Sequence, residues 1–303
     1  MSQQGLLKGD VHVSNPSPEI TAQLKGLLPP HPFHIKAEEA AALASQLSIS
    51  KEQLMVELIP VAREYAAPVV PISNFQVGSC ALGESGDLYL GVNMEFVGEN
   101  LAQTVHSEQS SFANLMIHGE RSLVALAVSS EPCGGCRQFL NELAGAQDLR
   151  IMIPERPLVS LCDLLPRSFG PRDLGIQAGM LAAVENPIHL PQGADSLVNL
   201  AWQAANRAYA PYSHCNAGVA LEYQDGQTVS GWYVENAAFN PSLSPLQAAL
   251  IMGHSLGRSY AQIARAVLVE RQGAPVTHAP AFRSLLGSLA PQAELLSFAT
   301  PPQ

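Results

Sequence analysis

An internal repeat divides this chain into two copies of one pattern. Residues 63 to 78 parallel residues 206 to 219, and residues 91 to 95 parallel residues 231 to 235. The chain has 303 residues, which is enough for two domains with hydrophobic cores of their own. We therefore predict two copies of one α/β unit within the chain.

Only the first copy carries residues with metal chemistry. It contains His106-Ser107-Glu108 and, further along, Pro132-Cys133-Gly134-Gly135-Cys136. At the corresponding place the second copy has Ser244-Pro245-Leu246-Gln247, and no cysteine follows its apolar run at residues 267 to 269. We therefore expect the second copy to bind no zinc.

The residue types in the first copy predict a catalytic zinc site. An imidazole and two thiolates, here His106, Cys133 and Cys136, are a common ligand set for Zn²⁺. Three protein ligands leave a coordination position open for water, which is typical of a catalyst and not of a structural clip. Glu108 follows His106 closely, and a carboxylate beside such a water can transfer its protons.

Each part of this motif has a simpler interpretation when it is taken alone. A CxxC pair can be a redox centre or half of a structural zinc site. A redox pair should follow the first strand of a thioredoxin-like unit, whereas Cys133 lies well inside the chain, and a structural four-cysteine site needs a second CxxC that the sequence lacks. The coincidence of all four residues favours the catalytic interpretation.

Both halves of the motif lie where helices are expected to begin. Pro132 suits the first turn of a helix that continues to about Leu143, and a second helical stretch covers residues 109 to 118. Unpaired N–H groups at a helix N-terminus lower the pKa of nearby thiols. Two such termini can therefore converge on one metal and favour the thiolates that zinc requires.

The rest of the first copy alternates between helix and strand signals. Ser50 and Gln53 resemble a capping box that opens a helix. We expect helices at residues 37 to 47 and 50 to 65, and strands at residues 76 to 82, 88 to 92, 123 to 128 and 149 to 153. This alternation predicts a layered α/β unit.

The order H-x-E followed by P-C-x-x-C is the known signature of zinc-dependent deaminases of nucleobases. With residues 71 to 78, residues 91 to 96 and Cys136-Arg137-Gln138-Phe139, the chain resembles the cytidine deaminase family in its long-chain, homodimeric form. The resemblance extends from about residue 50 to the C-terminal region. It implies a three-layer cytidine deaminase-like fold, with a mixed sheet between helices, that is duplicated and preceded by a small N-terminal helical segment.

Position by position, the resemblance implies one Zn²⁺ per chain, bound by His106, Cys133 and Cys136, with Glu108 as the proton shuttle. The reaction is then the hydrolytic deamination of cytidine and deoxycytidine, a step of pyrimidine salvage. Zinc lowers the pKa of its water, and Glu108 takes the proton. The hydroxide attacks C4 of the base while Glu108 returns protons to N3 and to the departing ammonia. We also hypothesise that Arg137 draws electron density from the thiolates.

The resemblance implies further contacts with the nucleoside. In the family the N-x-E segment holds the ribose hydroxyls and the S-N-F phenylalanine packs near the nucleoside, which indicates Asn93, Glu95 and Phe75. Asn93 and Glu95 alternate along an expected strand and should face the same side. An ordinary core role is the alternative for Phe75.

Two residues differ from the usual spelling of the family. Ser107 stands where alanine is common, and Glu131 stands where threonine or serine is usual. Both are expected to contact the substrate through main-chain groups, which tolerate the change of side chain. Glu-Pro-Cys resembles guanine and tRNA-adenosine deaminases, so a different base stays open as an alternative, as does a non-catalytic zinc-stabilised binding protein.

A chain with two copies can pair with itself to mimic four single-copy subunits, so we expect a homodimer. The resemblance implies that an aromatic residue from the partner's second copy closes the site, and Phe239 is the candidate, with a core role as its alternative. We expect an N-terminal helical segment at residues 1–48, a catalytic domain at 49–154, a linker at 155–192 and a degenerate second domain at 193–303.

The composition agrees with an enzyme that acts on free nucleosides. A net charge of -10 argues against a nucleic-acid partner, because polynucleotide channels carry basic side chains. Cys80, Cys162 and Cys215 are expected to be buried thiols, without a disulfide framework. Residues 1 to 10 lack the apolar core of a signal peptide, and no stretch is long enough to span a membrane. We therefore expect a cytoplasmic protein without a membrane partner.

Overall fold

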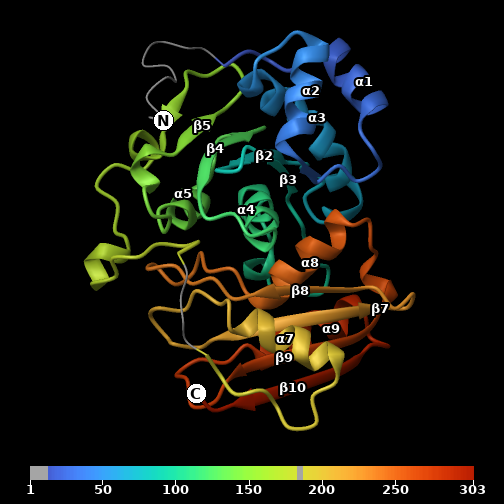
Figure 1. The fold of residues 1–303 in the computed structure, drawn as a ribbon, viewed down its shortest axis with the longest axis vertical. Helices are drawn as coiled ribbons and strands as arrows, with labels where there is room; N and C mark the ends of the chain where they lie inside the picture. The colour runs from blue at the N-terminus through green and yellow to red at the C-terminus, as the bar shows by residue number, and fades with distance from the viewer. Residues whose placement is uncertain (1–12, 183–186) are drawn as a thin grey trace.

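The computed structural model describes residues 13–182 and 187–303, which form two sheets with helices packed on them (Figure 1). The prediction that residues 1 to 10 contain no signal peptide lies outside these residues. No helix in the described part of the chain has the length and apolar character needed to cross a membrane.

The first sheet has the strand order β1-β3-β2-β4-β5-β6. Only β4 and β5 are parallel, and the other neighbours are antiparallel, so the sheet is mixed. Its elements are α1 (Pro18–Leu27), β1 (His34–Ile35), α2 (Ala37–Leu47), α3 (Lys51–Ala66), β2 (Gly78–Gly83), β3 (Leu88–Val92), α4 (Ser107–Ile117), β4 (Leu123–Val128), α5 (Gly134–Leu140), β5 (Arg150–Met152), β6 (Val159–Ser160) and α6 (Leu161–Leu164).

Two glycines show which helix covers which face of this sheet. A Cβ atom on Gly78 would lie 2.6 Å from the carbonyl oxygen of Ile59 in α3, and a Cβ atom on Gly91 would lie 2.4 Å from that of Ser107 in α4. Gly91 pairs with Ser79, the residue after Gly78, and successive residues of a strand point to opposite faces. Helices α3 and α4 therefore sandwich the sheet, and both approach it too closely for a side chain at these positions.

The second sheet repeats this arrangement with the strand order β10-β9-β7-β8. Gly218 and Gly231 meet the backbones of α7 and α8 as Gly78 and Gly91 meet those of α3 and α4. The elements are α7 (Ser196–Ala205), β7 (Ala217–Tyr223), β8 (Thr228–Trp232), α8 (Pro245–Ser255), β9 (Ile263–Arg271), α9 (Ala279–Leu289) and β10 (Glu294–Thr300). The duplicated three-layer α/β fold that the sequence predicts is thus confirmed.

The two copies pack through their equivalent helices. Helix α4 lies against α8 between the two sheets (Figure 1), and one continuous hydrophobic core extends from the first sheet into the second. A buried carboxylate, Glu142, adds polar contacts: it accepts hydrogen bonds from the hydroxyls of Tyr209 at 2.9 Å and Tyr212 at 2.5 Å, and from the Ala237 N–H at 2.8 Å. The second copy is therefore built into the same body as the first.

Most of the expected elements are present with small shifts of their ends. The helix at residues 37 to 47 and the strands at 88 to 92 and 123 to 128 have the predicted bounds, and Ser50 caps α3 by accepting from the Gln53 N–H. The expected helix from Pro132 to Leu143 is shorter, because Cys133 is its N-cap and Asn141 its C-cap. Strand β6 and helix α6 lie within the stretch expected to be a linker, and β6 extends the first sheet by pairing with β5.

Candidate metal centre and active site

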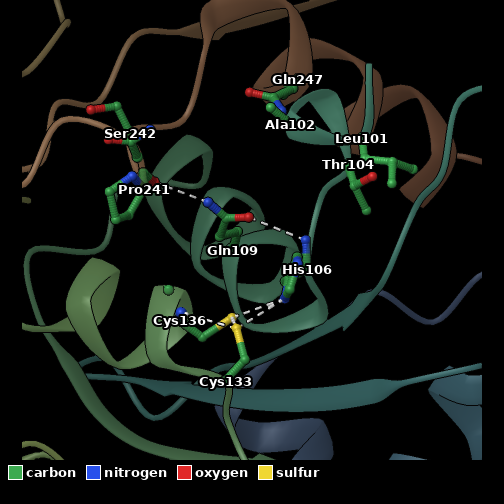
Figure 2. Close-up of a pocket in the computed structure, with 12 residues that line it drawn as sticks. Leu101, Ala102, Thr104, His106, Gln109, Cys133, Cys136, Pro241, Ser242 and Gln247 are labelled. Atoms are coloured by element: carbon green, nitrogen blue, oxygen red, sulfur yellow. Dashed lines mark hydrogen bonds between the residues drawn. The ribbon is translucent and has the colours of Figure 1, made fainter. Parts of the chain in front are cut away.

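Three side chains from two helix starts meet at one point. His106 is the N-cap of α4, Cys133 is the N-cap of α5, and Cys136 lies in the first turn of α5. The two sulfurs are 3.6 Å apart, and His106 Nδ1 lies 3.5 Å from Cys133 Sγ and 3.3 Å from Cys136 Sγ (Figure 2). Among the residues that the structure describes, this is the one such group of potential metal ligands.

These distances fit a tetrahedral zinc site. Bonds of about 2.3 Å to sulfur and about 2.05 Å to nitrogen at tetrahedral angles place two sulfurs about 3.8 Å apart, and a sulfur and a nitrogen about 3.6 Å apart. His106 and Cys133 are exposed residues, whereas Cys136 is buried, so one side of the group is open. The predicted ligands are thus already assembled in a geometry that Zn²⁺ accepts, with room for a further ligand.

The two thiols differ in their protonation. Their side-chain hydrogen bond, helped by backbone N–H groups of α5, lowers the pKa of Cys133 to about 4. The same hydrogen bond and burial raise the pKa of Cys136 well above its usual range. The metal-free pair therefore keeps one proton, which has to leave when both sulfurs bind a metal.

Glu108 lies beside this group and is almost completely buried. Burial raises the pKa of its carboxyl, although the positive charge of a protonated His106 acts in the opposite direction. The hydroxyl of Ser107 donates to Glu108 Oε2 at 3.2 Å. A carboxyl with a raised pKa, held at one position beside a group of metal ligands, can both take and return a proton.

A cavity of about 300 Å³ opens next to the three ligands. Its lining includes every substrate-contacting residue that the sequence analysis proposed for this chain's own pocket: Phe75, Asn93, Glu95, Ser107 and Glu131, together with Glu108 and the ligands His106 and Cys133. The structure thus brings together residues that lie more than fifty positions apart in the sequence.

Asn93 and Glu95 line the cavity from the segment after β3, not from within the strand. Asn93 donates to the carbonyl of Phe75 and accepts from the Val77 N–H, both at 2.8 Å. Glu95 accepts from the Ile72 N–H at 2.8 Å, from the Ser73 N–H at 2.9 Å and from the Ser73 hydroxyl. Burial alone would raise the pKa of Glu95, but these hydrogen bonds outweigh it and lower the pKa. Both residues therefore also fasten the segment that carries Phe75.

The remaining predicted residues differ in their exposure. Phe75 is 59% exposed, so it is not a core aromatic. Ser107 is fully buried, while Glu131 is exposed and lies 3.5 Å from Arg156 and 3.9 Å from Arg137. Arg137 also donates to the carbonyls of Pro132 and Leu164, at 2.7 Å and 2.9 Å, and so fixes the segment before Cys133. Its effect on the thiolates stays a hypothesis.

Phe239 is separated from the cavity of its own chain. It is 66% exposed, and its φ of 63° is a left-handed conformation that costs free energy for a residue with a side chain. The residues after it, Asn240 to Ser242, instead reach the other side of the ligand group and line a second cavity of about 200 Å³ with His106, Cys133 and Cys136 (Figure 2). An exposed aromatic in this strained conformation is not an ordinary core residue.

Among the described residues, the equivalent place in the second domain is almost completely filled. Ser244 and Leu246 occupy the positions of His106 and Glu108, and His278 and Phe282 of α9 fill the space beside them. The cavity that remains measures about 10 Å³, which is about the size of one water molecule. Its filled interior agrees with the loss of the ligand residues from its sequence.

Two groups of contacts were not expected from the sequence. Ser73 holds Glu95, and Gln109 connects α4 to the second domain. Both residues recur in the second copy, as Ser213 and Gln247. The repeat itself could have identified them, because residues that persist in a copy without ligands indicate a structural contact. Of the cysteines expected to be buried, Cys80 and Cys215 are, whereas Cys162 is half-buried and the prediction is wrong there.

Comparison with known proteins identifies relatives of both copies. Two family models, each described as a cytidine and deoxycytidylate deaminase zinc-binding region, match residues 49–152 and residues 161–283. The cytidine deaminase of Sodalis glossinidius (strain morsitans) is 45% identical over 287 residues, which cover 90% of this chain and 92% of that protein. That of Proteus mirabilis (strain HI4320) is 42% identical over 277 residues, covering 89% and 93%.

A crystal structure of cytidine deaminase from Mycobacterium tuberculosis covers 37% of this chain and 95% of its own, at 36% identity and a TM-score of 0.33.

Proposed function

The chain belongs to the cytidine and deoxycytidylate deaminase family, and we propose which of its residues carry out each part of the deamination. The activity is the zinc-dependent deamination of cytidine, in which cytidine and water give uridine and ammonia. We extend the proposal to deoxycytidine, since the two nucleosides share the base on which the reaction occurs. Residues 49–154 are proposed as the catalytic domain and residues 193–303 as the degenerate copy, with residues 155–192 between them.

One observation carries the assignment of the site. His106, Cys133 and Cys136 form a ligand set with tetrahedral distances, and Glu108 and the 300 Å³ cavity lie next to it. We propose that these three side chains hold the zinc and that Glu108 is the proton shuttle. Bound zinc supplies a Lewis acid that lowers the pKa of water toward neutrality.

Glu108 is suited to both halves of the proton transfer. Its raised pKa allows it to accept a proton from water and to donate it again to N3 of the base and to the departing amine. Burial removes competing water from the carboxyl, and the hydroxyl of Ser107 holds one of its oxygens at 3.2 Å. A residue without a carboxyl at this position would leave those protons without a carrier.

The rest of the cavity is proposed to orient the nucleoside. We propose that main-chain groups of Ser107 and Glu131 bind the polar edge of the base and that Phe75 packs against it, because all three residues line the cavity. Asn93 and Glu95 are the candidates for the ribose hydroxyls, because an amide and a carboxylate can together donate to and accept from a diol. Their existing hydrogen bonds to the Phe75 segment hold them in place before the substrate arrives.

We also propose that the chain acts as a homodimer in the cytoplasm. Large apolar side chains are exposed close to residues that line the cavities: Ile72, Phe75, Val97, Leu101 and Phe239. Exposed apolar groups of this kind favour a protein partner, and Phe239 is proposed to close the partner's cavity. The five cysteines are free thiols, which agrees with a reducing compartment.

The experiment that tests this assignment follows the ultraviolet change from cytidine to uridine, with zinc content measured in parallel. We expect Glu108→Ala to lose activity by a factor of about 100 or more while it retains zinc, because it removes the proton carrier and no ligand. Full activity in Glu108→Ala would exclude the shuttle role. A zinc-loaded wild type that leaves cytidine and deoxycytidine unchanged would direct attention to guanine and tRNA adenosine.

A further inference from the structure

Gln109 connects the metal-binding end of α4 to the second domain. Its side-chain oxygen accepts from the main-chain N–H of His106 at 3.1 Å, and its side-chain nitrogen donates to the carbonyl of Pro241 at 3.1 Å (Figure 2). Only 9% of Gln109 is exposed. Because one partner is a donor and the other an acceptor, turning the amide over would place N–H against N–H and oxygen against oxygen. Its orientation is therefore fixed.

The second copy makes the same connection in the opposite direction. Gln247, in the equivalent place on α8, accepts from the Ser244 N–H at 2.8 Å and donates to the carbonyl of Gln103 at 2.8 Å. It is 5% exposed. In each copy, the side-chain amide of a glutamine in the first turn of α4 or α8 thus donates to a main-chain carbonyl of the other copy.

The two helix starts differ in what their first side chain does. In α8 the hydroxyl of Ser244 accepts from the Gln247 N–H at 3.2 Å, so the capping box is reciprocal. In α4 the first side chain is the imidazole of His106, whose Nδ1 faces Cys133 and Cys136. The amide of Gln109 therefore holds the main chain of a residue whose side chain is committed to the metal group.

We propose that Gln109 is a positioning residue through which the zinc-free domain holds His106 in the orientation that the zinc site requires. The inference rests on the proposed role of His106, Cys133 and Cys136 as zinc ligands. Pro241 belongs to the segment, Asn240 to Ser242, that lines the cavity beside the ligand group. A single side chain, Gln109, therefore connects the second domain to His106. The second domain thereby supports catalysis within its own chain, apart from any contact with a partner.

The test compares two matched variants, Gln109→Met and Gln247→Met. Each removes one amide with its two hydrogen bonds at nearly the same side-chain volume, and only the first touches a ligand. Zinc affinity is measured by competition with a chelator, and the unfolding temperature is measured on the metal-free proteins. We expect similar losses of unfolding temperature in both, but an affinity about tenfold weaker in Gln109→Met alone.

A third variant, Gln109→Glu, separates the two bonds of this side chain. It keeps an oxygen for the His106 N–H but places a carboxylate oxygen against the Pro241 carbonyl. Its extra negative charge favours a cation, so weaker zinc binding here would come from the lost connection to the second domain. Wild-type zinc affinity in Gln109→Met, or an equal loss in Gln247→Met, overturns the proposal.

A parallel Cys133→Ala variant tests the ligand set on which the inference rests. Loss of zinc from Cys133→Ala together with unchanged affinity in Gln109→Met refutes the positioning role and leaves the zinc site in place. Full zinc retention in Cys133→Ala instead refutes the ligand set itself.

Discussion

Glu95 and Glu235 occupy equivalent positions in the two copies and make the same hydrogen bonds. Glu95 accepts from the main chain and hydroxyl of Ser73, and Glu235 does so from Ser213. The second copy lacks counterparts of the three ligand residues, so this interaction has a structural role that does not depend on the metal site. The two copies differ at the first residue after the strand, where Asn93 of the first copy corresponds to Tyr233 of the second. The family resemblance indicates that Glu95 contacts the ribose. Only the comparison with Glu235 shows that Glu95 also has a structural role.

The two serines therefore predict different effects on activity. Ser73→Ala and Ser213→Ala each remove one hydroxyl bonded to a carboxylate, so each should lower the free energy of unfolding by about 1.5–3 kcal/mol. We expect only Ser73→Ala to raise the KM for cytidine, since only Glu95 lines the cavity beside the ligands. Steady-state kinetics and denaturant unfolding of both variants measure this. An equal rise of KM in Ser213→Ala would contradict it.

At the scale of elements, close contacts between helix and strand place the metal site. Gly91 lets α4 approach β3 until the main chains touch, and this approach fixes the start of α4, where His106 and Glu108 lie. The internal repeat could predict that glycines occur at equivalent positions of the two copies. It could not predict that a helix packs against them, since a glycine in a strand can also mark a bulge or a bend. The end of α5 depends on contacts with the second domain at Glu142, which lies close to that end, and no local signal predicts those.

Helix α9 brings an unpaired imidazole into the second domain. His278 is half-buried and packs against Tyr233, with ring centroids 4.2 Å apart, and its Nε2 has no hydrogen-bond partner among the described residues. Burial lowers the pKa of His278 to about 4, and it does the same for His254 at the end of α8. Both rings are therefore neutral in the folded protein at neutral pH.

These histidines predict a loss of stability in mild acid. Their folded pKa of about 4 lies below the unfolded value of about 6.5, so the unfolded chain binds the proton first as the pH falls. Their contribution is complete above pH 6.5 and decreases toward pH 4, by about 3 kcal/mol for each ring.

The measurement is denaturant unfolding of the metal-free protein at several pH values, beside His278→Phe. This substitution keeps a ring against Tyr233 but removes the ionisable group. We expect its stability to fall by about 3 kcal/mol less than that of the wild type between pH 6.5 and pH 4. Identical pH profiles of the two proteins would show that His278 is not responsible.

At the scale of the whole molecule, the repeat and the zinc motif together predict most of the architecture and the members of the site. They do not predict β1, in which His34 and Ile35 pair with Tyr89 and Leu88 of the first sheet, because a pairing between distant segments leaves no local pattern in so short a strand. Helix α1 was also missed, although Ser17 caps it and Pro18 opens it. The filled interior of the second domain could not be predicted without knowing where α9 lies.

The homodimer proposal predicts that one chain affects catalysis in another. Phe239→Ala removes an exposed ring that lies outside the cavities of its own chain, so its own fold should lose little stability. If the ring closes the partner's cavity, we expect the KM for cytidine to rise about tenfold, which corresponds to about 1.4 kcal/mol of binding. Kinetics and light scattering of the variant check this, and an unchanged KM in a dimeric variant would exclude the lid role.

The closed pocket of the second domain changes which natural variants each copy can accept. At Leu246 and Phe282 a substitution is tolerated or rejected according to its volume, because those side chains fill a space of which only about 10 Å³ stays empty. At Glu108, the proposed proton shuttle, we expect a residue of the same volume without a carboxyl to fit and still to be inactive. We therefore expect the two copies to accept different substitutions, and a mutational path that gave the second copy a metal site would have to empty a packed interior before any ligand could be added.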